Sequence, residues 1–447
     1  MTNDPGFSFP QSRLQEIAAD ILDIARKKGA SACETDVSEG FGQSVTVRKG
    51  AVDTIEYNRD KGLGVTVYVG QQRGQASTSD FSRSALKAAV EAALSIARFT
   101  APDPCAGLAD VELMARDCPD LDLFHPWGIE VDEALTLARR CEEAAFAVDP
   151  RIANSEGASV STQQSHFVSA NSNGFMGGFA SSRHGVSCAV IAGEGDAMQR
   201  EYWYDNRRDA AELTAVEEVG RIAGERALAR LGARKIRTRS APVLFEAPIA
   251  IGFLGHLAQA ASGGALYRRS SFLLDALGQQ VFSPIVDVSE RPHIPKAFGA
   301  TWFDNDGVAT RDREVVSGGV LQGYFLSTYT ARKLGMQTTG NAGGSHNLRL
   351  KGGEDDLAGL LRRMDKGLLV TELLGQGVNY VTGDYSRGAV GFWVEKGKIK
   401  HPVQEVTIAG NLRDMFRNIV AVGNDALPRG AKHCGSVLIE SMKIAGS

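Results

Sequence analysis

The chain opens with apolar residues at helical spacing. Leu14, Ile17 and Ile21 fall on one face of a 3.6-residue period, and the segment closes with two lysines and Gly29. Cations and a glycine are typical of a helix C-terminus, so the pattern predicts an amphipathic helix. Ser82 precedes a second apolar run with the same spacing and is expected to cap another helix.

Between these two helices the apolar residues alternate with polar ones, as in strands. Alternating segments flank Lys49-Gly50, a pair suited to a tight turn, and a further apolar run extends from Gly64 to Val69. The pattern predicts a hairpin about Lys49-Gly50, followed by a separate strand.

The pattern dissolves between Thr100 and Pro126, around four prolines, which indicates a linker or long connection. A helix is then expected from about Val131 to Val148, followed by strands within Ile152 to Tyr204 and a helix from Ala211 to Leu231. The first half thus shows the order helix, strands, helix twice. This order predicts a mixed sheet-and-helix domain over residues 1–235.

Beyond Arg239 the chain consists of many short apolar runs separated by glycine. Alternation around the Lys396-Gly397 turn and a late apolar run at Val437 to Ile439 favour strands. The second half, residues 236–447, is therefore predicted to be β-rich, and the fold class of the whole chain is α+β.

Composition and charge exclude several classes of protein. The net charge of -4 is spread along the chain and forms no basic stripe, which argues against nucleic acid as a partner. The first ten residues lack the basic start and apolar core of a secretory signal. Ala247 to Leu266 is uncharged but is interrupted by polar residues and glycines, so no membrane span is predicted. The six scattered cysteines are expected to be reduced, and the cytoplasm is the expected location.

Motifs for several common chemistries are absent from the sequence. It contains no glycine-rich phosphate loop, no GxSxG turn and no HExxH zinc pair. Asp304-Asn305-Asp306-Gly307 has the start of a calcium loop, but Trp302 and Arg313 stand where acids would be needed, so a turn between strands is expected.

The second half contains several short sequence motifs that together resemble those of the TldD/PmbA metalloprotease family. They span nearly all of residues 240–447 and occur in the family's order. They are Arg269-Ser270-Ser271-Phe272-Leu273, Phe303-Asp304-Asn305-Asp306-Gly307, Thr339-Gly340-Asn341, Lys366 to Glu372, Thr382 to Gly388, Phe392 to Gly397 and Thr407 to Asn411. The resemblance implies a mixed N-terminal domain, a β-rich, barrel-like C-terminal domain and dimers of related subunits.

The resemblance also implies which type of member this is. Catalytic, TldD-like members carry HExxxH shortly before the Ser-Phe phrase and a cysteine near the C-terminus, which together hold zinc. Counted from Ser271-Phe272, these HExxxH positions are Leu254, Gly255 and Gln259 here, and only Cys434 remains. Leucine and glycine offer zinc no side-chain donor and a glutamine amide is a weak one, so no metal site and no catalytic residue are expected in this PmbA-type (TldE-like) chain.

The sequence leaves one metal alternative open. Cys434 could form a site with histidines from elsewhere in the chain, namely His256, His293 or His346. The preferred interpretation treats Cys434 as a packed thiol and His256 as a core or surface residue, because no second histidine follows His256 within a helical turn or two.

A glycine-rich strand region from Gly383 to Lys396 is the candidate substrate-binding segment. Glycines allow another backbone to approach closely, so an extended peptide could be added there as a strand. The candidate substrate-binding residues are Gly383, Tyr385, Arg387, Gly391 and Trp393.

The resemblance implies a function as well as a fold. The expected role is a non-catalytic subunit that forms a heterodimer with a TldD-like, zinc-bearing partner and admits unfolded peptides. Zinc is expected in the partner and no cofactor in this chain, and a homodimer stays open. Two rivals are a self-sufficient metallopeptidase with unconventional ligands and a peptide-binding or regulatory protein that is not proteolytic.

Overall fold

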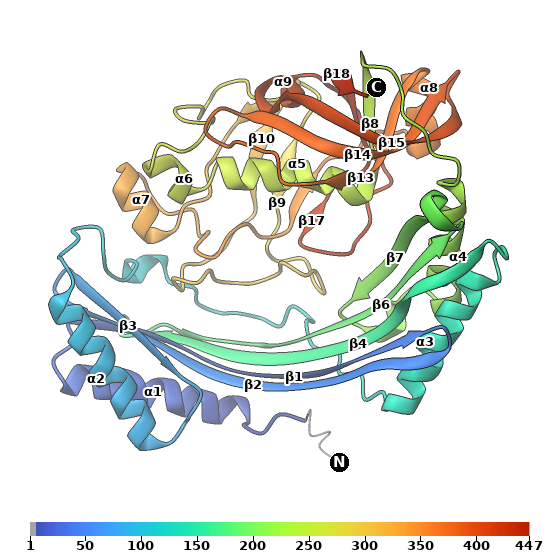
Figure 1. Cartoon of the computed structure of the whole chain (residues 1–447). Helices are drawn as coiled ribbons and strands as arrows, with labels where there is room; N and C mark the ends of the chain where they lie inside the picture. The colour runs from blue at the N-terminus through green and yellow to red at the C-terminus, as the bar shows by residue number, and fades with distance from the viewer. Residues whose placement is uncertain (1–5, 447) are drawn as a thin grey trace.

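The computed structural model describes residues 6–446. Figure 1 shows a long, curved sheet built by the first half of the chain, with helices on its outer side and the second half on its inner side. Within residues 6–446, none of the helices combines the length and the apolar character needed to cross a membrane.

The curved sheet is antiparallel, with the strand order β3-β2-β1-β4-β6-β7 and the short β5 beside β4. Lys49-Gly50 forms the predicted turn between β1 and β2, and both residues have positive φ. The strands are β1 Ala32–Arg48, β2 Ala51–Val69, β3 Gln72–Thr78, β4 Ile152–Asn171, β5 Met176–Gly177, β6 Ala180–Ala192 and β7 Gln199–Arg207.

The prediction of a separate strand at Gly64 to Val69 is wrong, because this segment is the end of the continuous strand β2. Residues 51–61 of β2 are exposed, since β2 pairs only with β1 there and β3 joins it from Leu63 onward. An exposed stretch does not need the apolar alternation that marks a half-buried strand. The sequence pattern therefore marks the two ends of β2 but not the exposed stretch that joins them.

Four helices cover the outer side of this sheet in two pairs (Figure 1). The first pair buries Leu14, Ile17 and Val90 against one end of the sheet, and the second pair buries Ala138 and Ala223 against the other end. The Ser82 hydroxyl accepts a hydrogen bond from the backbone of Ala85, which confirms the predicted cap. The helices are α1 Gln11–Lys27, α2 Arg83–Phe99, α3 Val131–Phe146 and α4 Val216–Ala229.

The predicted connection at residues 100–126 contains a single helical turn, Val111–Leu113, and is attached to the second half of the chain. Asp103 accepts hydrogen bonds from the Tyr329 hydroxyl and from Lys333. The indole nitrogen of Trp302 donates to the carbonyl of Pro119 at 2.6 Å. This segment therefore links the two halves by side-chain contacts as well as by sequence.

The second half is β-rich, as predicted. Strands β8, β13, β14, β15 and β18 pair in a closed ring, because β15 also pairs with β18, and β16 is attached outside. The strands are β8 Arg239–Phe245, β13 Gly367–Leu374, β14 Asp384–Glu395, β15 Lys398–Asn411, β16 Ile419–Val422 and β18 Val437–Ala445. This ring confirms the barrel-like α+β prediction.

A second sheet with the order β11-β10-β9-β12-β17 packs against this ring through a shared core that includes Phe245, Leu257, Val316 and Leu348. Its strands are β9 Val288–Glu290, β10 Arg313–Ser317, β11 Val320–Leu321, β12 Leu348–Leu350 and β17 Lys432–His433. The helices of this half are α5 Ala247–Ala260, α6 Gly263–Tyr267, α7 Thr328–Leu334, α8 Leu357–Met364 and α9 Leu412–Arg417.

Candidate functional site

Helix α5 contains Leu254, Gly255 and Gln259, the positions that the family resemblance aligns with the HExxxH motif. It begins after Glu246 with Pro248 in its first turn, where a missing N–H costs nothing. One face of the helix is buried in the core and includes Phe253, Leu254 and Leu257, which are at most 5% exposed. The rest of the helix is free to line a surface feature.

The opposite face of α5 lines a cavity of about 470 Å³. Gly255 and Gln259, one helical turn apart, both contribute to its wall. Lys432 of β17 lies on the same cavity, because α5 packs beside that strand. Leu254 instead belongs to the core, so of the three HExxxH positions only two face this space.

The wall of this cavity is polar but carries almost no ionisable groups. Small or neutral side chains such as Ser327, Thr330 and Asn341 alternate with glycines. Among the described residues that line it, none is a histidine, cysteine, aspartate or glutamate, and Lys432 is the one charged side chain. A cation and neutral oxygens do not fit a zinc centre, which needs imidazole, thiolate or carboxylate donors.

Cys434 lies just beyond β17 and is buried, at 1% exposed. Its thiol donates to the carbonyl of Gly435 at 3.1 Å. Burial, with the nearby charge of Asp425, raises the pKa of the Cys434 thiol well above its usual range. Cys434 is part of the hydrophobic core of the second half.

The three histidines considered as substitute ligands have separate partners. His256 Nδ1 lies 2.9 Å from the Tyr380 hydroxyl, whereas His346 Nε2 lies 3.0 Å from the carbonyl of Gly340. His293 stacks on Trp302, with ring centroids 3.7 Å apart. Within residues 6–446, no group of three or more histidine, cysteine or acidic side chains is placed to hold a metal ion. The alternative of a site formed by Cys434 and these histidines is not realised in this arrangement.

The candidate substrate strand is β14, and its structure corrects one prediction. β14 pairs with β13 on one edge and with β15 on the other, so neither edge is free to take up a peptide as an added strand. At Gly391, a Cβ atom would lie 1.8 Å from the Leu369 carbonyl oxygen. The close backbone approach that this glycine permits is therefore made by β13 of the same sheet.

The side chains along β14 are mostly buried. Tyr385 and Trp393 are 3% and 4% exposed and belong to the core, and Gly383 is buried beside Asn411. Arg387 is half-buried and donates weakly to the Leu373 carbonyl at 3.4 Å, while its Nε is buried without a hydrogen-bond partner. Contact of these residues with a substrate stays a prediction, and it cannot occur by strand addition at β14.

Sequence reasoning missed a polar cluster between α5 and β14. The rings of His256 and Tyr385 meet edge to face at 5.9 Å, and the charge of Arg387 acts on both. Burial, and then the charge of Arg387, lower the pKa of His256 to about 4, so this imidazole is neutral at pH 7. Burial also raises the pKa of Tyr385 to about 12. Tyr380, whose hydroxyl is hydrogen-bonded to the His256 ring, lies 124 residues further along the chain. No local spacing in the sequence could therefore have shown this cluster.

Two of the sequence motifs that carry the family resemblance, Thr339-Gly340-Asn341 and Phe303 to Gly307, have structural roles near the cavity. Asn341 donates to Glu290 at 2.9 Å and accepts from Arg313 at 3.0 Å, which fixes its place in the cavity wall. Asp304 accepts from the backbone N–H groups of Asp306 and Val308, so the segment that starts like a calcium loop is the predicted turn.

Comparison with known proteins connects this architecture to a family. The models of PmbA/TldA metallopeptidase domain 1, central domain and C-terminal domain match residues 33–97, 124–231 and 238–446. Metalloprotease PmbA of Escherichia coli O157:H7 is 48% identical over 97% of this chain and 96% of its own length. The chain belongs to the PmbA/TldD metallopeptidase family.

Other relatives agree with this PmbA/TldD assignment. A Metalloprotease PmbA homolog of Haemophilus influenzae is 48% identical over 98% of the chain and 97% of its own length. A Metalloprotease TldD homolog of the same organism is 22% identical over 95% of the chain and 92% of its own length. The chain is therefore more similar to the PmbA-type relative than to the TldD-type one.

Solved structures of the PmbA/TldD fold are also similar. A proposed modulator of DNA gyrase from Bacteroides thetaiotaomicron has a TM-score of 0.93 and 30% identity, with 98% of this chain and all of that chain covered. TldE from Thermococcus kodakarensis has a TM-score of 0.83 with 19% identity, covering 96% of this chain and all of that chain, which shows the shared fold alone.

Proposed function

We propose that this chain is the subunit of a PmbA/TldD-type metalloprotease that has no zinc centre of its own and that pairs with a TldD-like, zinc-bearing subunit. The main support for this proposal is the composition of the 470 Å³ cavity beside α5. Gly255 and Gln259 lie on the face of α5 that lines this cavity. A member of a metallopeptidase family with these residues at these positions keeps the fold but lacks the side chains that could bind zinc.

The substrates of this complex are unfolded peptides and small unfolded proteins. A protein without metal donors at its cavity can still contribute walls that limit what reaches the partner's zinc. The occurrence of a PmbA homolog and a TldD homolog in Haemophilus influenzae supports the view that two types of subunit coexist in one cell. We place the complex in the cytoplasm and assign it no need for ATP, since no phosphate-binding loop occurs in the chain.

The test is a comparison of this chain alone, the TldD-like relative from the same organism alone, and both co-expressed. Size-exclusion chromatography is expected to show a stable complex, and elemental analysis is expected to find zinc only with the relative. Cleavage of an unfolded peptide is expected from the complex, and a chelator is expected to stop it.

Two results would overturn the proposal in favour of its rivals. About one zinc per isolated chain together with chelator-sensitive cleavage would identify a self-sufficient metallopeptidase. Peptide binding by a chain that never associates with its relative would identify a binding or regulatory protein outside proteolysis.

A further inference from the structure

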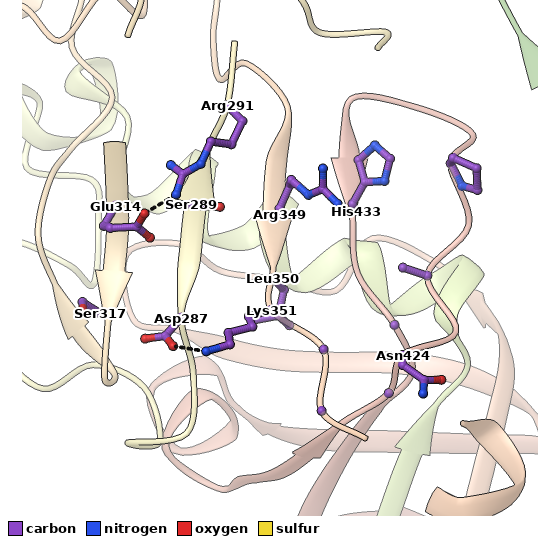
Figure 2. A pocket seen from close by; sticks show the side chains of 16 residues that line it. Asp287, Ser289, Arg291, Glu314, Ser317, Arg349, Leu350, Lys351, Asn424 and His433 are labelled. Carbon is purple, nitrogen blue, oxygen red and sulfur yellow. Dashed lines mark hydrogen bonds and ion pairs between the residues drawn. The ribbon is translucent and has the colours of Figure 1, made fainter. Parts of the chain in front are cut away.

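A second cavity, of about 1000 Å³, lies over the five-stranded sheet, and its lining includes His433 and Gly435 on either side of Cys434. Its floor is the outer face of β9, β10, β12 and β17, and its wall includes the loop segments 352–353 and 423–428 (Figure 2). The opposite face of the same strands carries Val288, Val316 and Leu348, which are buried in the core. The sheet alternation therefore leaves the floor of the cavity polar.

Strand register sets the side chains of the floor in a row. Ser289 of β9 is paired with Glu314 on one side and with Arg349 on the other, and Arg349 is paired in turn with His433. Figure 2 shows the Arg349 side chain beside the His433 ring. Neighbouring positions of a row lie about 5 Å apart, so one ligand group can reach two or three of them.

Most charges in this cavity are neutralised by a neighbour. Arg291 forms an ion pair with Glu314, and Lys351 lies 3.6 Å from Asp287. Arg349 differs, since it is exposed and makes no ion pair or side-chain hydrogen bond with any residue in the described part of the chain. The cavity thus holds one guanidinium whose hydrogen-bond donors are all uncommitted.

Two further hydrogen-bond donors lie beside this guanidinium. Ser289 and His433 occupy the positions paired with Arg349 on its two sides. An imidazole N–H and the Ser289 hydroxyl can each donate one hydrogen bond to an oxygen. A planar guanidinium with further donors next to it matches a carboxylate, which it can bind through two parallel hydrogen bonds.

We propose that this cavity binds the carboxylate group of a peptide, with Arg349 as the charged contact and Ser289 and His433 as neighbouring donors. The volume of about 1000 Å³ is large enough for several peptide residues next to that group. The inference rests on the proposed function for its ligand class, since it takes peptides as the substrates. It assigns the chain a recognition role that is separate from hydrolysis.

The experiment measures binding of an unstructured peptide of about ten residues, labelled at its N-terminus, to the full chain by fluorescence anisotropy. The peptide is used with a free C-terminal carboxylate, with a C-terminal amide, and as the amide with one internal glutamate. The free acid is expected to bind at least about tenfold more tightly than the amide, the size expected for a hydrogen-bonded charge.

Variants identify the contact. Arg349→Ala is expected to remove the preference for the free acid, and Arg349→Lys is expected to retain part of it, because lysine keeps the charge without the planar fork. Arg83→Ala is the matched control, since Arg83 is an exposed arginine of α2 without a side-chain partner in the described structure. That control is expected to bind all three peptides as the unchanged chain does.

Recovery of tight binding by the internal glutamate would assign the site to acidic side chains, and no recovery would assign it to the C-terminus. Equal affinity for the acid and the plain amide, or an unchanged preference in Arg349→Ala, would overturn the inference. If the chain forms a complex with the TldD-like relative but shows no preference for the free acid, only the carboxylate site is overturned and the proposed complex stands. A carboxylate preference without pairing overturns only the proposed complex.

Discussion

Arg226 and Glu246 form a two-pronged ion pair between the halves of the chain, with Nη1 2.8 Å from Oε1 and Nη2 3.0 Å from Oε2. Arg226 belongs to α4, and Glu246 is the residue directly before α5. Their side chains are 19% and 13% exposed, and the Arg226 guanidinium also lies over the ring of Trp203 at 5.1 Å. The pair therefore fixes the start of the helix that carries the candidate site.

Replacing Glu246 with alanine is expected to lower the free energy of unfolding by about 3 kcal/mol, because it leaves a largely buried guanidinium with poorer partners. Glu201, 3.4 Å from Arg226 Nε, keeps part of the compensation. Urea unfolding followed by tryptophan fluorescence measures the change. The control is Glu16→Ala, which breaks the exposed Arg13–Glu16 pair and is expected to cost less than about 1 kcal/mol. Equal losses in the two variants would contradict a special role for Glu246.

The assignment of the α5 faces gives a second prediction. Leu254→His places an imidazole in the core, where the lost packing and the buried polar group should cost about 3 kcal/mol. Gly255→His is expected to change stability by less than about 1 kcal/mol, because a Cβ there meets nothing within 4 Å. Thermal unfolding of both variants distinguishes them, and a Gly255→His protein as unstable as Leu254→His would show that this face is not open.

A third prediction concerns metal binding at the cavity. Gly255→His combined with Gln259→His puts two imidazoles one helical turn apart on the cavity face. This double variant is expected to bind zinc at least about tenfold more tightly than either single variant. Titration against a zinc-sensitive dye measures the affinities. If the double variant bound no better than the single ones, the two positions could not share a ligand in the folded protein.

Local patterns predicted a large part of the fold. The apolar period placed α1, α2 and α3, and Gly50 marked the turn after β1 because glycine adopts a positive φ readily. The continuity of β2 was missed because the exposed stretch between its two predicted ends has no alternation of apolar and polar residues. These successes and failures both follow from how much of each element is buried.

The site was less predictable than the fold, because its partners are distant in sequence. The loss of donors at Gly255 and Gln259 is visible in the chain itself. The pairing of β14 with β13 and β15 joins strands that follow one another, but the row from Glu314 to His433 depends on β9, β10, β12 and β17, which are far apart in the chain. Register between distant strands has no local signal.

A fourth prediction follows from the packing at Gly391. An added Cβ would overlap the Leu369 carbonyl oxygen, so Gly391→Ala is expected to lower the free energy of unfolding by roughly 3 kcal/mol. Gly62→Ala is the control within a strand, since a Cβ there meets nothing within 4 Å. Urea unfolding of the two variants tests this. Reduced peptide processing in a Gly391 variant of normal stability would instead restore a direct role for this residue in substrate contact.

The last prediction concerns pH and Glu34, a residue of β1 whose carboxylate accepts a hydrogen bond from the Tyr68 hydroxyl at 3.0 Å. Burial raises the pKa of Glu34 to about 7 from its usual 4.5, and the charge of Asp306 from the second half adds to the rise. The folded chain therefore holds this proton more tightly than the unfolded chain. The stabilisation is complete below about pH 4.5 and is lost as pH rises to about 7.

Glu34→Gln keeps an acceptor for Tyr68 but removes the titration, so its stability should fall less than that of the unchanged chain between pH 5 and pH 8. The difference between the two pH profiles is expected to be on the order of 2 kcal/mol, since each pKa unit corresponds to about 1.4 kcal/mol. Urea midpoints at pH 5, 6, 7 and 8 measure both profiles. Parallel profiles would mean that the pKa of Glu34 is the same in the folded and unfolded chains, and that the carboxylate is solvated despite its position between β1 and the Asp306 turn.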